Sequence, residues 1–130
     1  MCAQKVLVVD EDATGRIAGE TLQLEGYVVR YERDRRKAIE LLTRLKEQHL
    51  VFIRYMPPHW VGFDWSVLLA RRPRLQRHAY VEICRCPLRT SACDHWAIRE
   101  RFAIPVLPCP FTLEDVLTEA ARASDRLAVR

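Results

Sequence analysis

Short runs of apolar residues alternate along the chain with longer segments in which apolar residues recur every three or four positions. The short runs are typical of buried β-strands, and the longer segments are typical of amphipathic helices. Strands are expected near residues 5–9, 27–31, 50–54, 79–84 and 104–108. Because five strands alternate with helical segments, the sequence predicts an α/β fold in which helices cover both faces of a parallel sheet.

Two helix starts carry residues that can cap free backbone N–H groups. Asp12 precedes the first helical segment, and Thr112 precedes the last one. The first helix also contains Gly15 and Gly19, each of which weakens a helix by roughly 1 kcal/mol relative to alanine. We therefore expect this helix to depend on packing against the sheet.

Length and composition suit one domain. The chain has 130 residues, of which 49% are hydrophobic and 29% are charged. We expect the domain to span residues 1–126 and a C-terminal tail to span 127–130. The sequence has no apolar run long enough for a membrane span, so a cytoplasmic protein that does not bind a membrane is expected. Five cysteines without the short spacing of a disulfide framework also fit a reducing compartment.

Charge and motif content argue against two classes of function. The net charge is +4, but the basic residues are scattered among acidic ones, which favours a solvated surface over direct nucleic acid binding. No glycine-rich phosphate loop follows the first strand, which argues against a nucleotide or flavin enzyme. Neither a catalytic residue nor a cofactor is assigned.

The ends of the predicted strands hold the candidate site, because ligands of open parallel sheets bind beyond the carboxyl ends of the strands. The residues at these ends are Asp10, Glu11 and Asp12 after the first strand, Arg54 at the third, Cys84 at the fourth and Cys109 after the fifth.

Four segments, in this order and spacing, resemble the receiver domain of bacterial response regulators. They are Val6–Asp12, Glu25–Val29, Val51–Pro58 followed by Gly62 and Phe63, and Pro108–Phe111. The resemblance covers nearly the whole chain. It implies a flavodoxin-like (βα)5 three-layer sandwich whose five-stranded parallel sheet has the order 2-1-3-4-5, and a role in two-component signal transduction rather than as an enzyme.

The resemblance also shows where this chain departs from the family. In receivers, an acidic pair after the first strand holds magnesium, and an aspartate at the end of the third strand accepts the phosphoryl group. Asp10 and Glu11 match the acidic pair, but Arg54 stands at the phospho-acceptor position. Cys84 replaces the hydroxyl residue of the fourth strand, and Cys109 replaces the lysine of the fifth. Val106 stands where an aromatic switch residue is common.

Arg54 changes the chemistry that this pocket can perform. A guanidinium cannot form an acyl phosphate, and its positive charge opposes metal binding. We expect Arg54 to form a salt bridge with Asp10, Glu11 or Asp12 and to take the place of the metal, so no metal ligand is assigned. The alternative is that Arg54 points to solvent at a site that has drifted.

The leading functional hypothesis is a pseudo-receiver, a non-phosphorylatable receiver-like domain that binds a protein partner. The partner would be a histidine kinase, a regulator or an output domain of a bacterial signalling or transcription-control pathway, or a second copy in a homodimer. By resemblance, the contact surface would include Trp96, Arg99, Val106, Leu107, Leu117 and Arg122.

Two other hypotheses remain open from sequence. Cys84 and Cys109 end neighbouring strands, so a thiol-based redox sensor is conceivable, and Cys86, Cys93 and His95 would add ligand types for zinc. Cysteines can also simply fill space in a core. The third hypothesis, a small flavodoxin-like enzyme, would need a cofactor or base at the strand ends.

Glu82 is an unusual residue for its place in the sequence, since it falls inside a strand expected to be buried. A buried carboxylate needs a partner, which Arg54 or a shifted strand register could provide.

Overall fold

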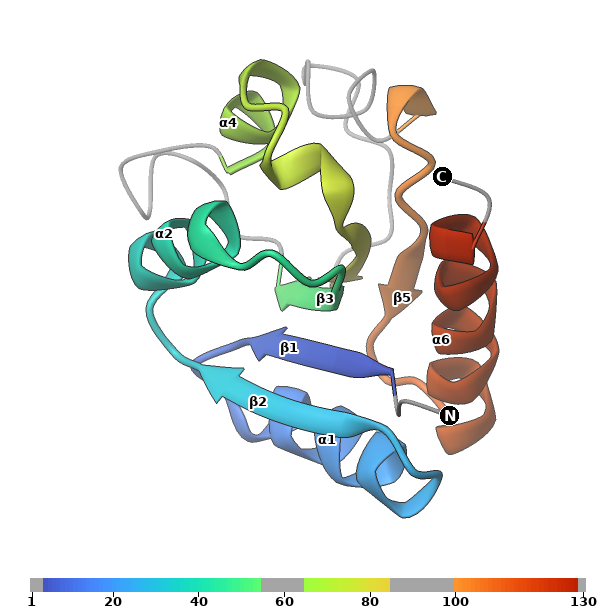
Figure 1. Cartoon of the computed structure of the whole chain (residues 1–130). Coiled ribbons are helices and arrows are strands. Elements are labelled where there is room, and N and C mark those ends of the chain that lie inside the picture. Colours follow the sequence, from blue (N-terminus) through green and yellow to red (C-terminus); the bar gives the residue numbers. More distant parts are fainter. Residues whose placement is uncertain (1–3, 55–64, 85–99, 129–130) are drawn as a thin grey trace.

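The computed structural model describes residues 4–54, 65–84 and 100–128, and contains one sheet of five parallel strands (Figure 1). The strand order is β2-β1-β3-β4-β5, which confirms the predicted α/β fold and topology. The strands are β1 (Lys5–Val9), β2 (Val28–Glu32), β3 (Leu50–Arg54), β4 (Ala79–Cys84) and β5 (Val106–Pro108). The helices are α1 (Ala13–Leu24), α2 (Arg35–Arg44), α4 (Trp65–Arg71), the short 3₁₀ helix η1 (Leu75–Arg77) and α6 (Leu113–Ala128).

Two strands begin later than the sequence predicted, each for a backbone reason. The N–H of Tyr27 donates to the carbonyl of Leu22 and Gly26 has a φ of 94°, so Tyr27 still belongs to the turn that closes α1. At β5, Pro105 accepts a hydrogen bond from the N–H of Glu82 but has no N–H to donate in return. Regular pairing therefore starts at Val28 and at Val106.

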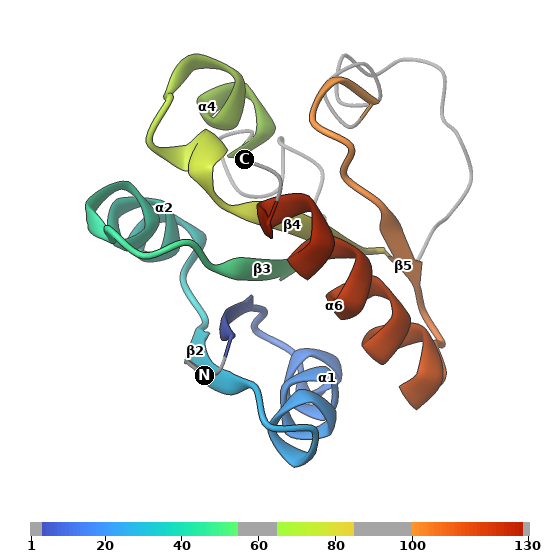
Figure 2. The ribbon, with the colours of Figure 1, turned by 45° about the vertical axis from the view of Figure 1, so that its right-hand side comes forward.

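Helices cover both faces of the sheet, giving three layers. Helices α1 and α6 lie side by side on one face (Figure 2), where Val8, Phe52 and Val81 pack against Leu22 and Val116. Helices α2 and α4 cover the other face. There the buried residues are Leu7, Val9, Val51, Ile53 and Tyr80 from the strands, with Ile39, Leu42 and Leu69 from the helices. Strands β3 and β4 are buried along their whole length, which explains their continuous apolar sequences.

Only one of the two predicted helix caps is present as a side-chain cap. Thr112 Oγ1 accepts a hydrogen bond from the N–H of Asp115, while the Asp115 carboxylate accepts one from the N–H of Thr112. Asp12 occupies the N-cap position of α1, but its side chain caps no N–H group. Its carboxylate instead faces Arg54, as described below.

The glycines of α1 allow close packing against the sheet. A Cβ atom at Gly19 would overlap the ring of Tyr31 on β2, and one at Gly15 would overlap the side chain of Asp10. The expected dependence of α1 on sheet packing thus has a local cause, and Gly15 leaves room for the carboxylate at the end of β1.

Helix α6 runs to Ala128 and buries Leu127, which is 5% exposed, so the helix extends into the segment where the sequence placed a tail. Among the helices in the described ranges, none is both long and apolar enough to cross a membrane.

Candidate functional site

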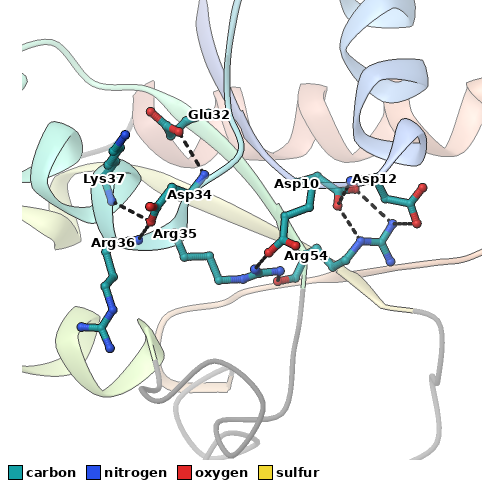
Figure 3. Close-up of polar contacts among 9 residues, drawn as sticks. Asp10, Asp12, Glu32, Asp34, Arg35, Arg36, Lys37 and Arg54 are labelled. Atoms are coloured by element: carbon teal, nitrogen blue, oxygen red, sulfur yellow. Dashed lines mark hydrogen bonds and ion pairs between the residues drawn. The ribbon is translucent and has the colours of Figure 1, made fainter.

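Arg54 forms a buried, two-pronged ion pair with Asp10 at the carboxyl edge of the sheet (Figure 3). Its Nε donates to Asp10 Oδ1 at 2.7 Å, and its Nη2 donates to Asp10 Oδ2 at 3.0 Å. The side chains are 7% and 1% exposed, respectively. This geometry matches the fork of a guanidinium to the two oxygens of a carboxylate, and it confirms the predicted contact between Arg54 and the acidic segment.

Asp12 completes the surroundings of this pair. Its backbone N–H donates to Asp10 Oδ1 at 3.0 Å, and its Oδ2 lies 3.9 Å from Arg54 Nη2. Burial alone would lower the pKa of Arg54, but the hydrogen bonds to Asp10 and the negative charges nearby outweigh it and raise the pKa above its usual value. Arg54 therefore remains charged at neutral pH.

Glu11 does not contact Arg54. Its Oε1 accepts a hydrogen bond from Arg35 Nη1 at 2.8 Å, and Arg35 Nη2 donates to the backbone carbonyl of Arg54 at 3.3 Å. Arg35 is 5% exposed, so a second buried guanidinium supports the strand end that carries the first.

Sequence reasoning missed Arg35, which it grouped with scattered basic residues of a solvated surface. One feature of the sequence could have indicated that Arg35 has a carboxylate partner. Arg35 opens α2, and a cation in the first turn of a helix opposes the helix dipole unless a carboxylate lies nearby. Asp34, directly before it, caps the helix by accepting hydrogen bonds from the N–H groups of Arg36 and Lys37.

The three consecutive acids do not converge on one point. Asp10 lies against Gly15 of α1 and pairs with Arg54, whereas Glu11 reaches toward α2 and pairs with Arg35. Both oxygens of Asp10 already accept guanidinium hydrogen bonds. Within the described part of the chain, no group of three or more His, Cys, Asp or Glu side chains is arranged to hold a metal ion. The side chains present here do not fit Mg²⁺, which requires several oxygen ligands around one point.

Cys84 and Cys109 meet through their backbones, but their side chains lie on different faces of the sheet. The N–H of Cys109 donates to the carbonyl of Cys84 at 2.9 Å, and no disulfide joins the two residues. Cys84 alternates with Ile83, which faces α6, whereas Cys109 packs against the same cluster as Ile83. Neither cysteine forms a disulfide, and the redox-sensor hypothesis stays a prediction. Cys86, Cys93 and His95 lie outside the described residues.

Comparison with known proteins identifies the fold. No protein-family model matches the chain, and no curated protein matches it. Among solved structures, a CheY-like receiver domain protein from Methanospirillum hungatei superposes with a TM-score of 0.77, with 98% of each chain covered at 19% sequence identity. The receiver fold is present here.

Two further structures agree with this assignment. The signal receiver domain of an HD domain-containing protein from Pseudomonas fluorescens gives a TM-score of 0.76 at 19% identity, covering 99% of this chain and 92% of that one. The chemotaxis protein CheY4 of Vibrio cholerae gives 0.71 at 20% identity, covering 94% and 99%.

Within this receiver fold, Glu82 sits in the register expected without any shift. It pairs with Ile53 on one side and Val106 on the other, and it is fully buried. Arg54 is aligned with Ile83, one position further along, and its guanidinium is held by Asp10. Arg54 is therefore not the partner of Glu82, and neither of the two expected solutions applies.

The predicted interaction surface is only partly available. Leu107 is 1% exposed because its side chain points from β5 into the core beneath α6. Its inclusion in the predicted interaction surface was therefore wrong. Val106 and Leu117 are partly exposed, and Arg122 is exposed and pairs with Glu119 at 3.0 Å. Trp96 and Arg99 lie outside the described residues.

Proposed function

We propose that this chain is a receiver-like domain that works without phosphorylation, as a protein-interaction module in bacterial signal transduction or transcription control. A receiver fold is generally a signalling module rather than an enzyme, and it is the basis of the signalling part of the proposal. The observation that carries the phosphorylation-independent part is the buried ion pair between Arg54 and Asp10.

The ion pair has two chemical consequences at the position that, by resemblance, accepts the phosphoryl group. Phosphotransfer to protein needs a carboxylate nucleophile at this place, and a guanidinium has none. The positive charge of Arg54 also neutralises the Asp10 carboxylate, as a bound metal ion would otherwise do. The pocket would then keep one arrangement regardless of magnesium or phosphodonor.

Signalling through such a domain would depend on protein contacts. By resemblance, the contact surface would include Val106 and Leu117, which are partly exposed apolar residues, and Arg122, which is an exposed cation; such a mixture is suited to a protein interface. The partner would be a histidine kinase, a regulator, an output domain or a second copy of this chain.

The pocket is tested by backbone NMR of the native protein titrated with Mg²⁺ and beryllium fluoride, a mimic of the phosphoryl group. We expect the amide resonances of Asp10, Glu11 and Cys84 to stay in place. Saturable shifts clustered at these three residues would overturn the proposal. Leu127, in the last turn of α6 and so at the opposite end of that helix from Cys109, serves as an internal reference for non-specific salt effects.

The interaction role is tested by light scattering across a range of protein concentrations, using the native chain and a Leu117→Glu variant. A homodimer through this face predicts a mass that rises with concentration in the native protein and stays monomeric in the variant. A native protein that is monomeric throughout would rule out the homodimer and leave heterologous partners.

A further inference from the structure

A cavity lies at the end of the sheet opposite to Arg54, where the strands begin. Its volume is about 250 Å³, which is just below the usual range of roughly 300–1,000 Å³ for small-molecule pockets. It lies between the starts of β1 and β2 and the segment that joins α2 to β3. Its lining residues are Lys5, Val6, Val28, Arg30, Leu45, Lys46, Glu47 and His49.

The charge of this cavity is positive and incompletely compensated. Lys5 Nζ lies 2.6 Å from the carboxylate of Glu47, so these two charges neutralise each other. Within the ranges that the structure describes, Arg30 and Lys46 have no ion-pair or hydrogen-bond partner for their side chains. Three cations and one carboxylate leave a net charge of +2 around a single cavity. Cations gathered without a counter-charge repel one another, and a bound dianion would relieve that repulsion.

His49, which lines the cavity, is held by two hydrogen bonds, and one of them defines the tautomer of its ring. Its Nδ1 lies 2.8 Å from the carbonyl oxygen of Glu47, and because a carbonyl only accepts, Nδ1 carries the hydrogen. The backbone N–H of His49 donates to Nδ1 of His78 at 3.0 Å, which anchors the residue in the core. In the neutral ring, Nε2 is therefore an acceptor, suited to a hydroxyl group on the organic part of a ligand.

The remaining lining is apolar. Val6, Val28 and Leu45 contribute hydrocarbon surface beside the charged groups. A ligand that fits both features carries a compact dianion on a small apolar body, and the cavity volume restricts that body to about the size of one ring.

We propose that this cavity binds a small organic phosphate monoester. Its charge of about −2 at neutral pH matches the net charge of the lining, while its apolar part contacts the valine and leucine side chains. The site is independent of the Arg54 pocket, because the two lie at opposite ends of β1.

Phenyl phosphate is the probe, and NMR titration of the full chain at fixed ionic strength is the assay. We expect saturable shifts at Lys5, Arg30 and Lys46, with phenyl phosphate binding at least tenfold more tightly than inorganic phosphate and with phenol giving no shifts. Equal affinity for inorganic phosphate would overturn the organic-ligand part, and non-saturable or scattered shifts would overturn the site.

Charge variants supply the matched control. Arg30→Gln and Lys46→Gln are exposed changes expected to preserve the fold, and each should weaken phenyl phosphate binding about tenfold, the effect of removing one charge contact of roughly 1.4 kcal/mol. Arg72→Gln removes an exposed cation after α4 and should leave the affinity unchanged. Equal weakening by all three variants would show that only overall charge matters and would refute the proposal.

Discussion

Replacement of Arg54 by methionine is predicted to destabilise the protein strongly. Methionine keeps most of the length of the side chain but removes both hydrogen bonds to Asp10, whose side chain is 1% exposed. Hydrogen bonds to charged groups contribute about 1.5–3 kcal/mol each. Leaving one member of a buried ion pair without its partner costs about 3–5 kcal/mol, which is consistent with two such bonds. The loss is a large share of a total stability of roughly 5–15 kcal/mol.

Urea denaturation at pH 7, followed by circular dichroism, measures this loss. With a slope of about 2 kcal/mol per molar urea, the midpoint should fall by about 1.5–2.5 M. Arg72→Met removes an exposed arginine and should change stability by less than about 0.5 kcal/mol. Adding Asp10→Asn to Arg54→Met should restore roughly half of the loss, because no carboxylate then remains buried. If Arg54→Met unfolds within about 1 kcal/mol of the native protein, the reasoning on this ion pair is refuted.

Three further changes test the packing, the capping and the charge of the fold. Gly19→Ala, which normally strengthens a helix, should here cost about 1 kcal/mol or more by overlapping Tyr31; calorimetry should show the sign reversed in a Tyr31→Ala background. Thr112→Ala should cost about 0.5–2 kcal/mol by removing the cap on the N–H of Asp115, and an unchanged urea midpoint would contradict this. The hydrogen bond from Lys5 lowers the pKa of Glu47. The stabilisation that this ion pair gives the fold is therefore complete above the usual glutamate pKa, and it is lost as the pH falls through the lowered value. Glu47→Gln should therefore differ from the native protein at pH 7 and match it in strong acid, and a difference that grows on acidification would show the wrong sign.

The strands could be predicted from sequence where burial is complete. β1, β3 and β4 begin and end at the predicted residues, because strands covered on both faces are continuous apolar runs. β2 could not be placed as accurately, since Tyr27 is apolar yet its N–H closes the preceding helix turn. Backbone hydrogen bonds of this kind leave no mark in the hydrophobic pattern.

The site was predictable in its main contact and not in its detail. A cation beside consecutive acids at one sheet edge has a strong reason to pair with them, which predicted that Arg54 pairs with Asp10, Glu11 or Asp12. Which acid each arginine takes depends on the alternation of side chains past the strand end and on where α2 begins, so the pairing of Arg35 with Glu11 needed the three-dimensional structure. The same alternation separates Cys84 from Cys109.

The most direct test of the central claim, that Arg54 occupies the place of a metal ion, is an Mg²⁺ titration of the native protein and an Arg54→Asp variant, followed by NMR. In the native protein, the amides of Asp10 and Glu11 should not shift at millimolar Mg²⁺. In the variant, two facing carboxylates should bind the ion, and Mg²⁺ at about ten times its Kd should raise the stability by roughly 1.4 kcal/mol. Saturable binding of Mg²⁺ by the native protein below millimolar concentration would contradict the account.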